Sequence, residues 1–263
     1  MMYALIKMQT AGTHCKKPSL TTSTHGGARA GAGRKPGLRR PVPHRERPVH
    51  RTAHPLHITL RAREHVWNLR SKRGLRVLRQ AFAGGSKRFG FRLVQYSVQG
   101  NHLHLIAEAP DRVALGRAMK GLGVRIARRL NRLMATRGAV FRERFHARAL
   151  RSPLEVKRAL LYVLSNFRKH QGQIRKRLPD NWLDPFSSAR HFDGWRRTPD
   201  LTTALAAARD PCADLPPGVH APNLSLLRRD WRRHGLLDPS AAPGPTLGRG
   251  APIEHRAQGA QQR

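Results

Sequence analysis

Two predicted strands and the connection between them lie in the stretch FRLVQYSVQGNHLHLIAEA, residues 91–109. We expect strands over Phe91–Val98 and His102–Ala109, because each is a short and largely apolar run. Gly and Asn tolerate positive φ, so Gln99-Gly100-Asn101 is predicted to be a tight connection. The two strands should therefore be antiparallel neighbours.

Upstream of this pair, the sequence predicts one more strand and a helix. His54–Arg61 alternates between apolar and polar residues, which is typical of a strand with one buried face. Ser71–Ala83 is expected to form a short basic helix that ends at Gly84-Gly85.

Downstream of the pair, two further helices are predicted. Leu115–Thr136 repeats apolar residues every three or four positions. Ser152–His170 opens with a capping-box pair, its first residue and Glu155, and has Pro153 at the first helical position. Ala139–Leu150 fits a strand or an extended loop equally well. This order of elements predicts an α+β fold, with one antiparallel sheet covered by helices.

The charge of the chain points to a phosphate-bearing partner. Its 263 residues include 51 Lys and Arg but only 15 Asp and Glu, a net charge of +36. Nucleic acid is the first candidate, because neutralised phosphates release counterions. An anionic membrane is the weaker candidate and no membrane partner is expected, since no apolar run approaches the roughly 18 residues of a spanning helix.

Composition divides the chain into three regions. Residues 1–53 are rich in Gly, Ala and Pro and are predicted to be a disordered basic arm. Residues 54–172 hold 26 basic and 5 acidic residues and nearly all the periodicity, so they are the expected folded domain. Residues 173–263 are expected to be a loosely structured, Pro- and Ala-rich extension that is partly helical. The two cysteines form no C-x-x-C pair, and without a secretory signal we expect a cytoplasmic, nucleoid-associated protein.

A histidine pair is the first candidate for chemistry. On a strand, His102 and His104 project from the same face, while Leu103 and Leu105 face the core. Two imidazoles about 7 Å apart can converge on one divalent cation. The alternative is that both are solvent-side residues of a half-buried strand.

A helical tyrosine is the second candidate. On a helical wheel, Tyr162 lies nearly opposite the apolar arc of its helix, which argues against core packing. Asn166 follows one turn later, so the two side chains point the same way. A phenol beside an amide oxygen and nearby cations suits nucleophilic attack on a phosphodiester, although an ordinary exposed tyrosine remains the alternative.

These residues resemble the single-tyrosine transposases that carry the HUH signature, histidine–hydrophobic–histidine. The resemblance covers about residues 54–172 and rests on three ordered blocks: residues 99–106, residues 140–148 and residues 162–172. The subgroup that it resembles most is that of the REP-associated tyrosine transposases. Gln99-Gly100 and Asn166-Phe167 depart from the usual family pattern, but neither removes a catalytic group.

The resemblance implies an RRM-like, or ferredoxin-like, antiparallel core that cuts and rejoins single-stranded DNA beside a hairpin. It implies that His102, His104 and Asn166 bind Mg²⁺ or Mn²⁺. Tyr162 would be the nucleophile, leaving a 5′-phosphotyrosine link and a free 3′-hydroxyl. The metal would draw charge from a non-bridging phosphate oxygen, and the covalent link would conserve bond energy, so rejoining would need no ATP.

The predicted partner is single-stranded, hairpin-forming DNA, bound by a monomer or a homodimer. A row of cations on the outer face of the 115–136 helix is either a solvated surface or a phosphate-facing one, and we favour the second. The residues expected to contact DNA are Arg117, Lys120, Arg125, Arg128, Arg132, Arg144, His146, Arg148, Arg158 and Lys169.

Two non-enzymatic alternatives remain open from the sequence. The first is a DNA- or RNA-binding module with the same fold and no catalysis; the presence of His102, His104 and Tyr162 together favours the enzyme. The second is a basic RNA-binding protein of ribosomal type, which should offer aromatic residues on its sheet for base stacking. Only Phe91 and Tyr96 are available for that purpose.

Overall fold

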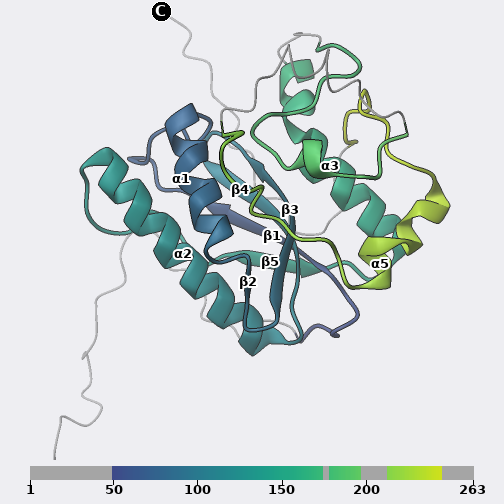
Figure 1. Ribbon diagram of the computed structural model, residues 1–263, viewed down its shortest axis with the longest axis horizontal. Helices are drawn as coiled ribbons and strands as arrows, with labels where there is room; N and C mark the ends of the chain where they lie inside the picture. Colours follow the sequence, from purple (N-terminus) through teal and green to yellow (C-terminus); the bar gives the residue numbers. More distant parts are fainter. Residues whose placement is uncertain (1–48, 174–177, 197–211, 245–263) are drawn as a thin grey trace, which may run out of the picture. The chain divides into compact units, whose positions relative to one another are not determined.

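The sheet predicted from the sequence has five strands, and every pair of neighbours is antiparallel (Figure 1). Its spatial order is β2-β3-β4-β1-β5. The strands are β1 (Leu56–Arg61), β2 (Lys87–Arg88), β3 (Phe91–Val98), β4 (His102–Glu108) and β5 (His146–Ala149). The computed structural model describes residues 49–173, 178–196 and 212–244. The predicted basic arm therefore lies almost wholly outside the described residues.

Helices follow the strands in the order that the sequence predicts. The described helices are α1 (Lys72–Ala83), α2 (Arg112–Met134), α3 (Pro153–Gln173) and α5 (Ser225–Arg228), with 3₁₀ turns η1 (Ala189–His191) and η2 (Asp230–His234). Ser71 caps α1 by accepting a hydrogen bond from the N–H of Gly74, and Gly84 ends that helix, as expected.

The start of α3 also follows the sequence, with one difference. The Ser152 hydroxyl accepts a hydrogen bond from the N–H of Glu155 at 3.3 Å. The Glu155 carboxylate, however, accepts at 2.6 Å from the N–H of Arg151, one residue before the expected partner. Both bonds satisfy backbone donors that a helix start would otherwise leave unpaired.

The alternation of the strands builds two cores, one on each face of the sheet. On one face, the leucines and isoleucine of β1 and the leucines of β4 pack with α1 and α2. On the other face, Val94 of β3 and Ile106 of β4 pack with α3. In Figure 1, α1 and α2 lie together and apart from α3, in agreement with these two clusters.

The strand order confirms the ferredoxin-like prediction. With the two-residue β2 set aside, the chain runs β1-α1-β3-β4-α2-β5 and the sheet runs β3-β4-β1-β5, which is the split βαβ arrangement. The undecided stretch Ala139–Leu150 supplies β5, which pairs with β1. The short strand β2 has no counterpart among the sequence predictions, because two residues are too few to show a period.

The described parts of the C-terminal extension complete the core behind α3. Trp231 is fully buried against this helix, together with Leu227 and Leu237. The buried Cys212 joins the opposite core, beside α1 and α2. The extension is partly helical, as its composition indicates, and its described residues also close both hydrophobic layers.

A partly buried arginine ties the extension to the end of α3. Both guanidinium nitrogens of Arg70 donate to the carboxylate of Asp184 at 2.9 Å. Its guanidinium carbon also lies 3.7 Å from the centre of the Phe167 ring on α3 and 4.5 Å from that of Phe186. This bidentate pair between aromatic rings holds the loop before α1, the helix α3 and the 184–186 segment in one arrangement.

None of the described helices is both long enough and apolar enough to cross a membrane.

Candidate active site

The predicted histidines and the tyrosine meet between the sheet and α3. β4 and β1 are antiparallel, with His104 opposite Thr59 and His102 opposite Arg61. Directly opposed residues share a face of the sheet, and this face carries α3 rather than α1 and α2. Leu103 and Leu105 point to the other face and are fully buried there, as predicted.

The two histidines of the signature lie against each other. The centres of the His102 and His104 rings are 4.7 Å apart, with the rings nearly perpendicular. The Nδ1 atom of His102 lies 2.8 Å from Oδ1 of Asn101. Because an amide oxygen only accepts, His102 carries its proton on Nδ1 and keeps the lone pair on Nε2. His104 is only 4% exposed, so the alternative of two solvent-side histidines does not hold for it.

A third histidine completes the cluster, and the sequence assigns it no catalytic part. Nε2 of His57 and Oγ1 of Thr59 each lie 3.3 Å from Nδ1 of His104. Both come from β1, where every second residue faces α3. They therefore approach His104 from the side away from its free Nε2 atom.

Tyr162 reaches this cluster from α3. Its ring centre lies 5.0 Å from that of His104 and 5.7 Å from that of His57, in edge-on contacts. Asn166, one turn later, is 1% exposed. The next residue on the same helical line is His170, whose charge acts on both His102 and His104. The line Tyr162–Asn166–His170 thus runs along the histidines.

The surroundings of Tyr162 differ from the exposure that the helical wheel suggests. The side of α3 that carries Tyr162 and Asn166 faces the sheet, so Asn166 is buried and Tyr162 is half-buried. A second side of the helix is covered by the extension, through Leu227 of α5 and Trp231 of η2. The apolar arc that the wheel detects is thus buried by the extension as well as by the sheet.

Burial keeps the three imidazoles neutral. Desolvation, followed by the charges of Arg148 and His146, lowers the pKa of His57 to about 4. Desolvation, followed by His170 and Arg61, lowers the pKa of His102 to about 4. The pKa of His104 falls well below its usual value, mainly through desolvation. Near pH 7 each ring therefore offers a lone pair rather than a positive charge.

The tyrosine is shifted in the opposite direction. Desolvation raises the pKa of the Tyr162 phenol above its ordinary value, because burial disfavours the phenolate. The phenol is therefore protonated at neutral pH, and nucleophilic attack requires help from a cation or a base.

The residues present fit a divalent metal. Two buried polar atoms lack any hydrogen-bond partner among the described residues: Nε2 of His104 and Nδ2 of Asn166. His102 likewise keeps its Nε2 lone pair free of the Asn101 bond. An amide can turn to present its oxygen, so two imidazoles and one carbonyl are available. Within the described ranges no three His, Cys, Asp or Glu side chains gather as a metal cluster.

Four residues of the site are absent from the sequence predictions: His57, Thr59, Arg61 and His170. The period-2 pattern of β1 puts the first three on its polar face. The pattern does not show that β1 pairs with β4, which is what brings them to the histidines. His170 repeats the four-residue spacing of Tyr162 and Asn166, and that spacing could have identified it.

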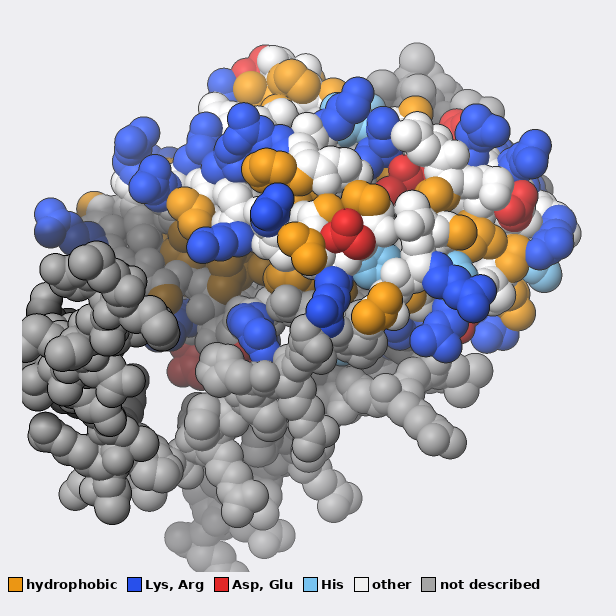
Figure 2. All heavy atoms as spheres, turned by 90° about the horizontal axis from the view of Figure 1, so that it is seen from below, with side chains coloured by type: hydrophobic (Ala, Val, Ile, Leu, Met, Phe, Trp, Pro, Cys, Tyr) orange, Lys and Arg blue, Asp and Glu red, His pale blue; other side chains and the backbone are white. Residues whose placement is uncertain are grey.

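Basic side chains of β5 flank the site on the α3 face of the sheet. β5 places His146 opposite Thr59 and Arg148 opposite His57. Of the remaining residues predicted to bind DNA near the site, Arg144 and Arg158 are exposed and Lys169 is partly exposed. Lys and Arg side chains also outnumber Asp and Glu on the face drawn in Figure 2.

The basic residues of α2 lie in a different layer. Arg117, Lys120, Arg128 and Arg132 are exposed and Arg125 is partly exposed, on a helix that packs with α1 on the opposite face of the sheet. Arg128 and Arg132 line a hollow of about 520 Å³ beside α1, together with Arg129. These cations are therefore separated from the histidines by the sheet itself.

Phe91 and Tyr96 do not form an aromatic surface on which bases could stack. Phe91 is 0% and Tyr96 is 2% exposed, and both pack towards α1 and α2. This removes the feature that a stacking RNA-binding protein of ribosomal type requires.

Comparison with protein-family models gives a match within the folded region. Residues 51–155 match the family model described as "Transposase IS200 like". The matched part, about two fifths of the chain, is similar to that family. The match includes β1, both histidines of β4 and β5, but it stops seven residues before Tyr162. The family match therefore covers the histidines, and the fold alone brings Tyr162 to them.

Two other comparisons add little. A comparison with curated protein sequences gave no significant match. One similar solved structure is a REP-associated tyrosine transposase bound to a REP hairpin: identity is 17%, the match covers 70% of this chain and 93% of that chain, and the TM-score is 0.43. Another is a transposase structure from Deinococcus radiodurans, with 14% identity, coverage of 46% and 88%, and a TM-score of 0.32.

Proposed function

We propose that this protein is a metal-dependent transposase that cuts and rejoins single-stranded DNA through a covalent bond to Tyr162. The observation that carries the proposal is the contact between Tyr162 and His104, whose ring centres lie 5.0 Å apart although 57 residues separate them in the chain. A phenol beside two neutral imidazoles and an amide combines a nucleophile with potential metal ligands.

His102, His104 and Asn166 would hold Mg²⁺ or Mn²⁺. When bound, the metal withdraws charge from a phosphate oxygen and orients the phosphodiester. If Nε2 of His104 held the metal, the proton of this ring would be on Nδ1, where His57 Nε2 and Thr59 Oγ1 are in reach to accept it. These two β1 residues thereby hold the His104 ring in one tautomer and orientation.

Tyr162 would form the covalent bond. Its oxygen attacks phosphorus, the bond from phosphorus to the 3′ oxygen breaks, and the phenolic proton is lost while the 3′ oxygen gains one. The products are a 5′-phosphotyrosine and a free 3′-hydroxyl, and the reverse reaction on another 3′-hydroxyl completes strand transfer. Arg61, His146 and Arg148 lie on the same face of the sheet and would bind the phosphates that flank the scissile bond.

The substrate proposed is single-stranded DNA next to a hairpin. The resemblance of the sequence to single-tyrosine transposases supports this substrate. The basic side chains beside the site, Arg61 and Arg148, also suit the phosphates of a flexible single strand.

A single assay tests the proposal. Purified full-length protein is mixed with a labelled, hairpin-bearing single-stranded oligonucleotide and Mg²⁺ or Mn²⁺, and covalent adducts are separated on a denaturing gel. We expect an adduct that EDTA and Tyr162→Phe both abolish, and that the matched variant Tyr96→Phe retains. An adduct that survives Tyr162→Phe refutes the nucleophile assignment. Tight binding with no adduct under any metal would instead indicate the non-catalytic nucleic-acid-binding module.

A further inference from the structure

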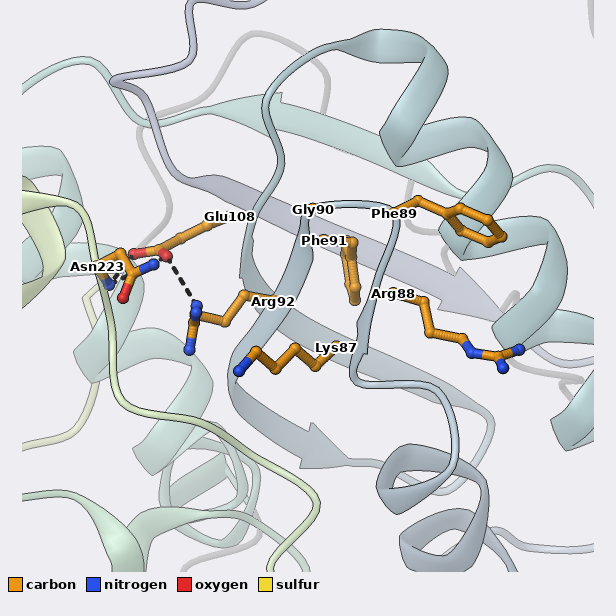
Figure 3. Close-up of a pocket in the computed structure, with 8 residues that line it drawn as sticks. All are labelled: Lys87, Arg88, Phe89, Gly90, Phe91, Arg92, Glu108 and Asn223. Atoms are coloured by element: carbon orange, nitrogen blue, oxygen red, sulfur yellow. Dashed lines mark hydrogen bonds and ion pairs between the residues drawn. The ribbon is translucent and has the colours of Figure 1, made fainter.

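An aromatic side chain stands exposed at the tip of the β2–β3 hairpin. Phe89 is 57% exposed and lies between the two strands, directly after the exposed cations Lys87 and Arg88 (Figure 3). This tip is remote from the histidines, because β3 runs from the hairpin towards the connection before His102. At about 3.4 Å per residue along the strands, the tip lies on the order of 20 Å from His104.

The backbone at the tip is not one that a phenylalanine favours. Phe89 has φ of 56° and Gly90 has φ of 74°, so both central residues of the turn are in the left-handed region. Asn, Asp and Gly are the residues that suit such hairpin turns. A bulky side chain there costs on the order of 1 kcal/mol or more. Neither turn geometry nor core packing therefore accounts for an aromatic residue at this position.

The cations Lys87 and Arg88 also lack a direct partner among the described residues, although the charge of Lys87 acts on His220. No ion pair or side-chain hydrogen bond joins Lys87 or Arg88 to another described residue. Arg92 differs, because its Nε lies 3.6 Å from the Glu108 carboxylate across a hollow of about 360 Å³ (Figure 3). Glu108 is fully engaged, since it also accepts hydrogen bonds from the N–H groups of Asn223 and Leu224.

The hairpin is next to the basic helix α2. Arg88 pairs with Phe91 across the hairpin and therefore lies on the α2 side of the sheet. A Cβ atom added at Gly85, two residues before β2, would lie 3.6 Å from Cδ of Arg125 on α2. Arg88, Arg125 and the outer arginines of α2 thus belong to neighbouring, mainly basic surfaces, in which the exposed Asp111 at the start of α2 is an acidic exception.

We propose that residues 87–90 form a second nucleic-acid contact, in which Phe89 stacks on an unpaired base while Lys87 and Arg88 bind the phosphates beside it. This contact lies outside the site of Tyr162, and it rests on the proposed nucleic-acid partner but not on cutting. Stacking needs a base with a free face, so a single-stranded segment fits better than an intact duplex. A second copy of this chain is a poorer occupant, because it would bring the same unpaired cations against these.

The test is a binding measurement that does not depend on cleavage. Full-length protein is titrated in EDTA onto a fluorescein-labelled 20-nucleotide thymidine oligomer, at several salt concentrations. We expect Phe89→Asn to weaken binding by about tenfold at every salt concentration, in the range of one lost base–aromatic stack. The slope of affinity against salt should be unchanged by this variant. The double variant Lys87→Gln/Arg88→Gln should lower that slope by about 1.4, or about 0.7 per lost phosphate contact.

Stability separates a binding role from a folding role. Asn suits the positive φ at position 89, so Phe89→Asn should melt no lower than the parent protein while it binds more weakly. Phe89→Trp should keep the affinity, and Val113→Ala, which alters an equally exposed apolar residue on α2, should change nothing. The proposal is overturned if Phe89→Asn leaves the affinity for the oligonucleotide unchanged. This includes the case in which the variant changes the oligomeric state of the protein but not that affinity. If Phe89→Asn weakens binding as expected but no Tyr162 adduct forms, only the proposed DNA cutting is contradicted. If the adduct forms but Phe89→Asn binds as tightly as the parent protein, only the proposed hairpin contact is contradicted.

Discussion

The two faces of the sheet use the same strands for opposite purposes. On the α1–α2 face, Leu103 and Leu105 are fully buried among other apolar side chains. On the α3 face, His104 is nearly as buried, but its Nε2 atom has no hydrogen-bond partner among the described residues. Burial of an unpaired polar atom costs about 1–3 kcal/mol, so the α3 face gives up stability to keep ligands available. A strand of alternating residues can thus carry a dry core and a reactive cluster back to back.

Trp231 tests whether the extension supports the reactive face. Trp231→Ala removes the largest fully buried side chain behind α3, and we expect it to lower the free energy of unfolding by about 3–5 kcal/mol. Urea denaturation followed by far-UV circular dichroism measures this loss. Trp67→Ala is the matched control, because Trp67 is 53% exposed and its removal should change stability by no more than about 0.5 kcal/mol. Equal effects of the two variants would show that the extension does not support α3.

Neighbouring residues on β4 test the contrast between the faces directly. Leu105→Ala should cost about 3 kcal/mol of stability, because it opens a cavity in the α1–α2 core. His104→Leu should cost less than about 1 kcal/mol, since it removes an unpaired buried atom, yet it should abolish adduct formation. Chemical denaturation and the adduct gel give the two readouts. If His104→Leu proves as destabilising as Leu105→Ala, the idea that the α3 face sacrifices stability is wrong.

Acid should weaken the reactive face selectively. The pKa of His57 is lowered in the fold to about 4 from an ordinary 6.5, so the unfolded chain binds more protons between these values. Stability is therefore complete above about pH 6.5 and falls as the pH drops towards 4. At pH 5 this histidine accounts for about 2 kcal/mol of the loss.

The variant His57→Gln isolates that contribution. Melting temperatures of the metal-free protein at pH 7 and pH 5 should differ less in His57→Gln than in the parent protein. His65→Gln, which alters an exposed histidine on the loop before α1, should leave the difference as it was. An acid loss that His57→Gln does not reduce would place the titrating groups elsewhere.

The elements of the fold could be predicted because each depends on local chemistry. The alternation of β1, the Gly-Asn connection before β4 and the Ser cap of α1 all involve residues within a few positions of one another. β5 remained undecided, since a four-residue edge strand is stabilised by its partner β1 rather than by its own pattern.

The site could be predicted only in part, for the same reason. His102, His104, Tyr162 and Asn166 each show their direction through the period of their own element. His57, Thr59 and Arg61 reach the cluster through the pairing of β1 with β4, between residues more than 40 positions apart. The half-buried state of Tyr162 could not be predicted from its own helix, because it depends on the contact of that side of α3 with His57 and His104 of the sheet.

The sequence alone therefore determined which side chains share a face, because the periods of strand and helix are local properties of the backbone. It also determined the sign of the partner's charge, since a net charge of +36 does not depend on folding. Only the tertiary structure decided which faces meet. It brought Tyr162 to the histidines, placed the cations of α2 on the other side of the sheet and left Phe89 exposed, because contacts between distant segments depend on how the whole core packs.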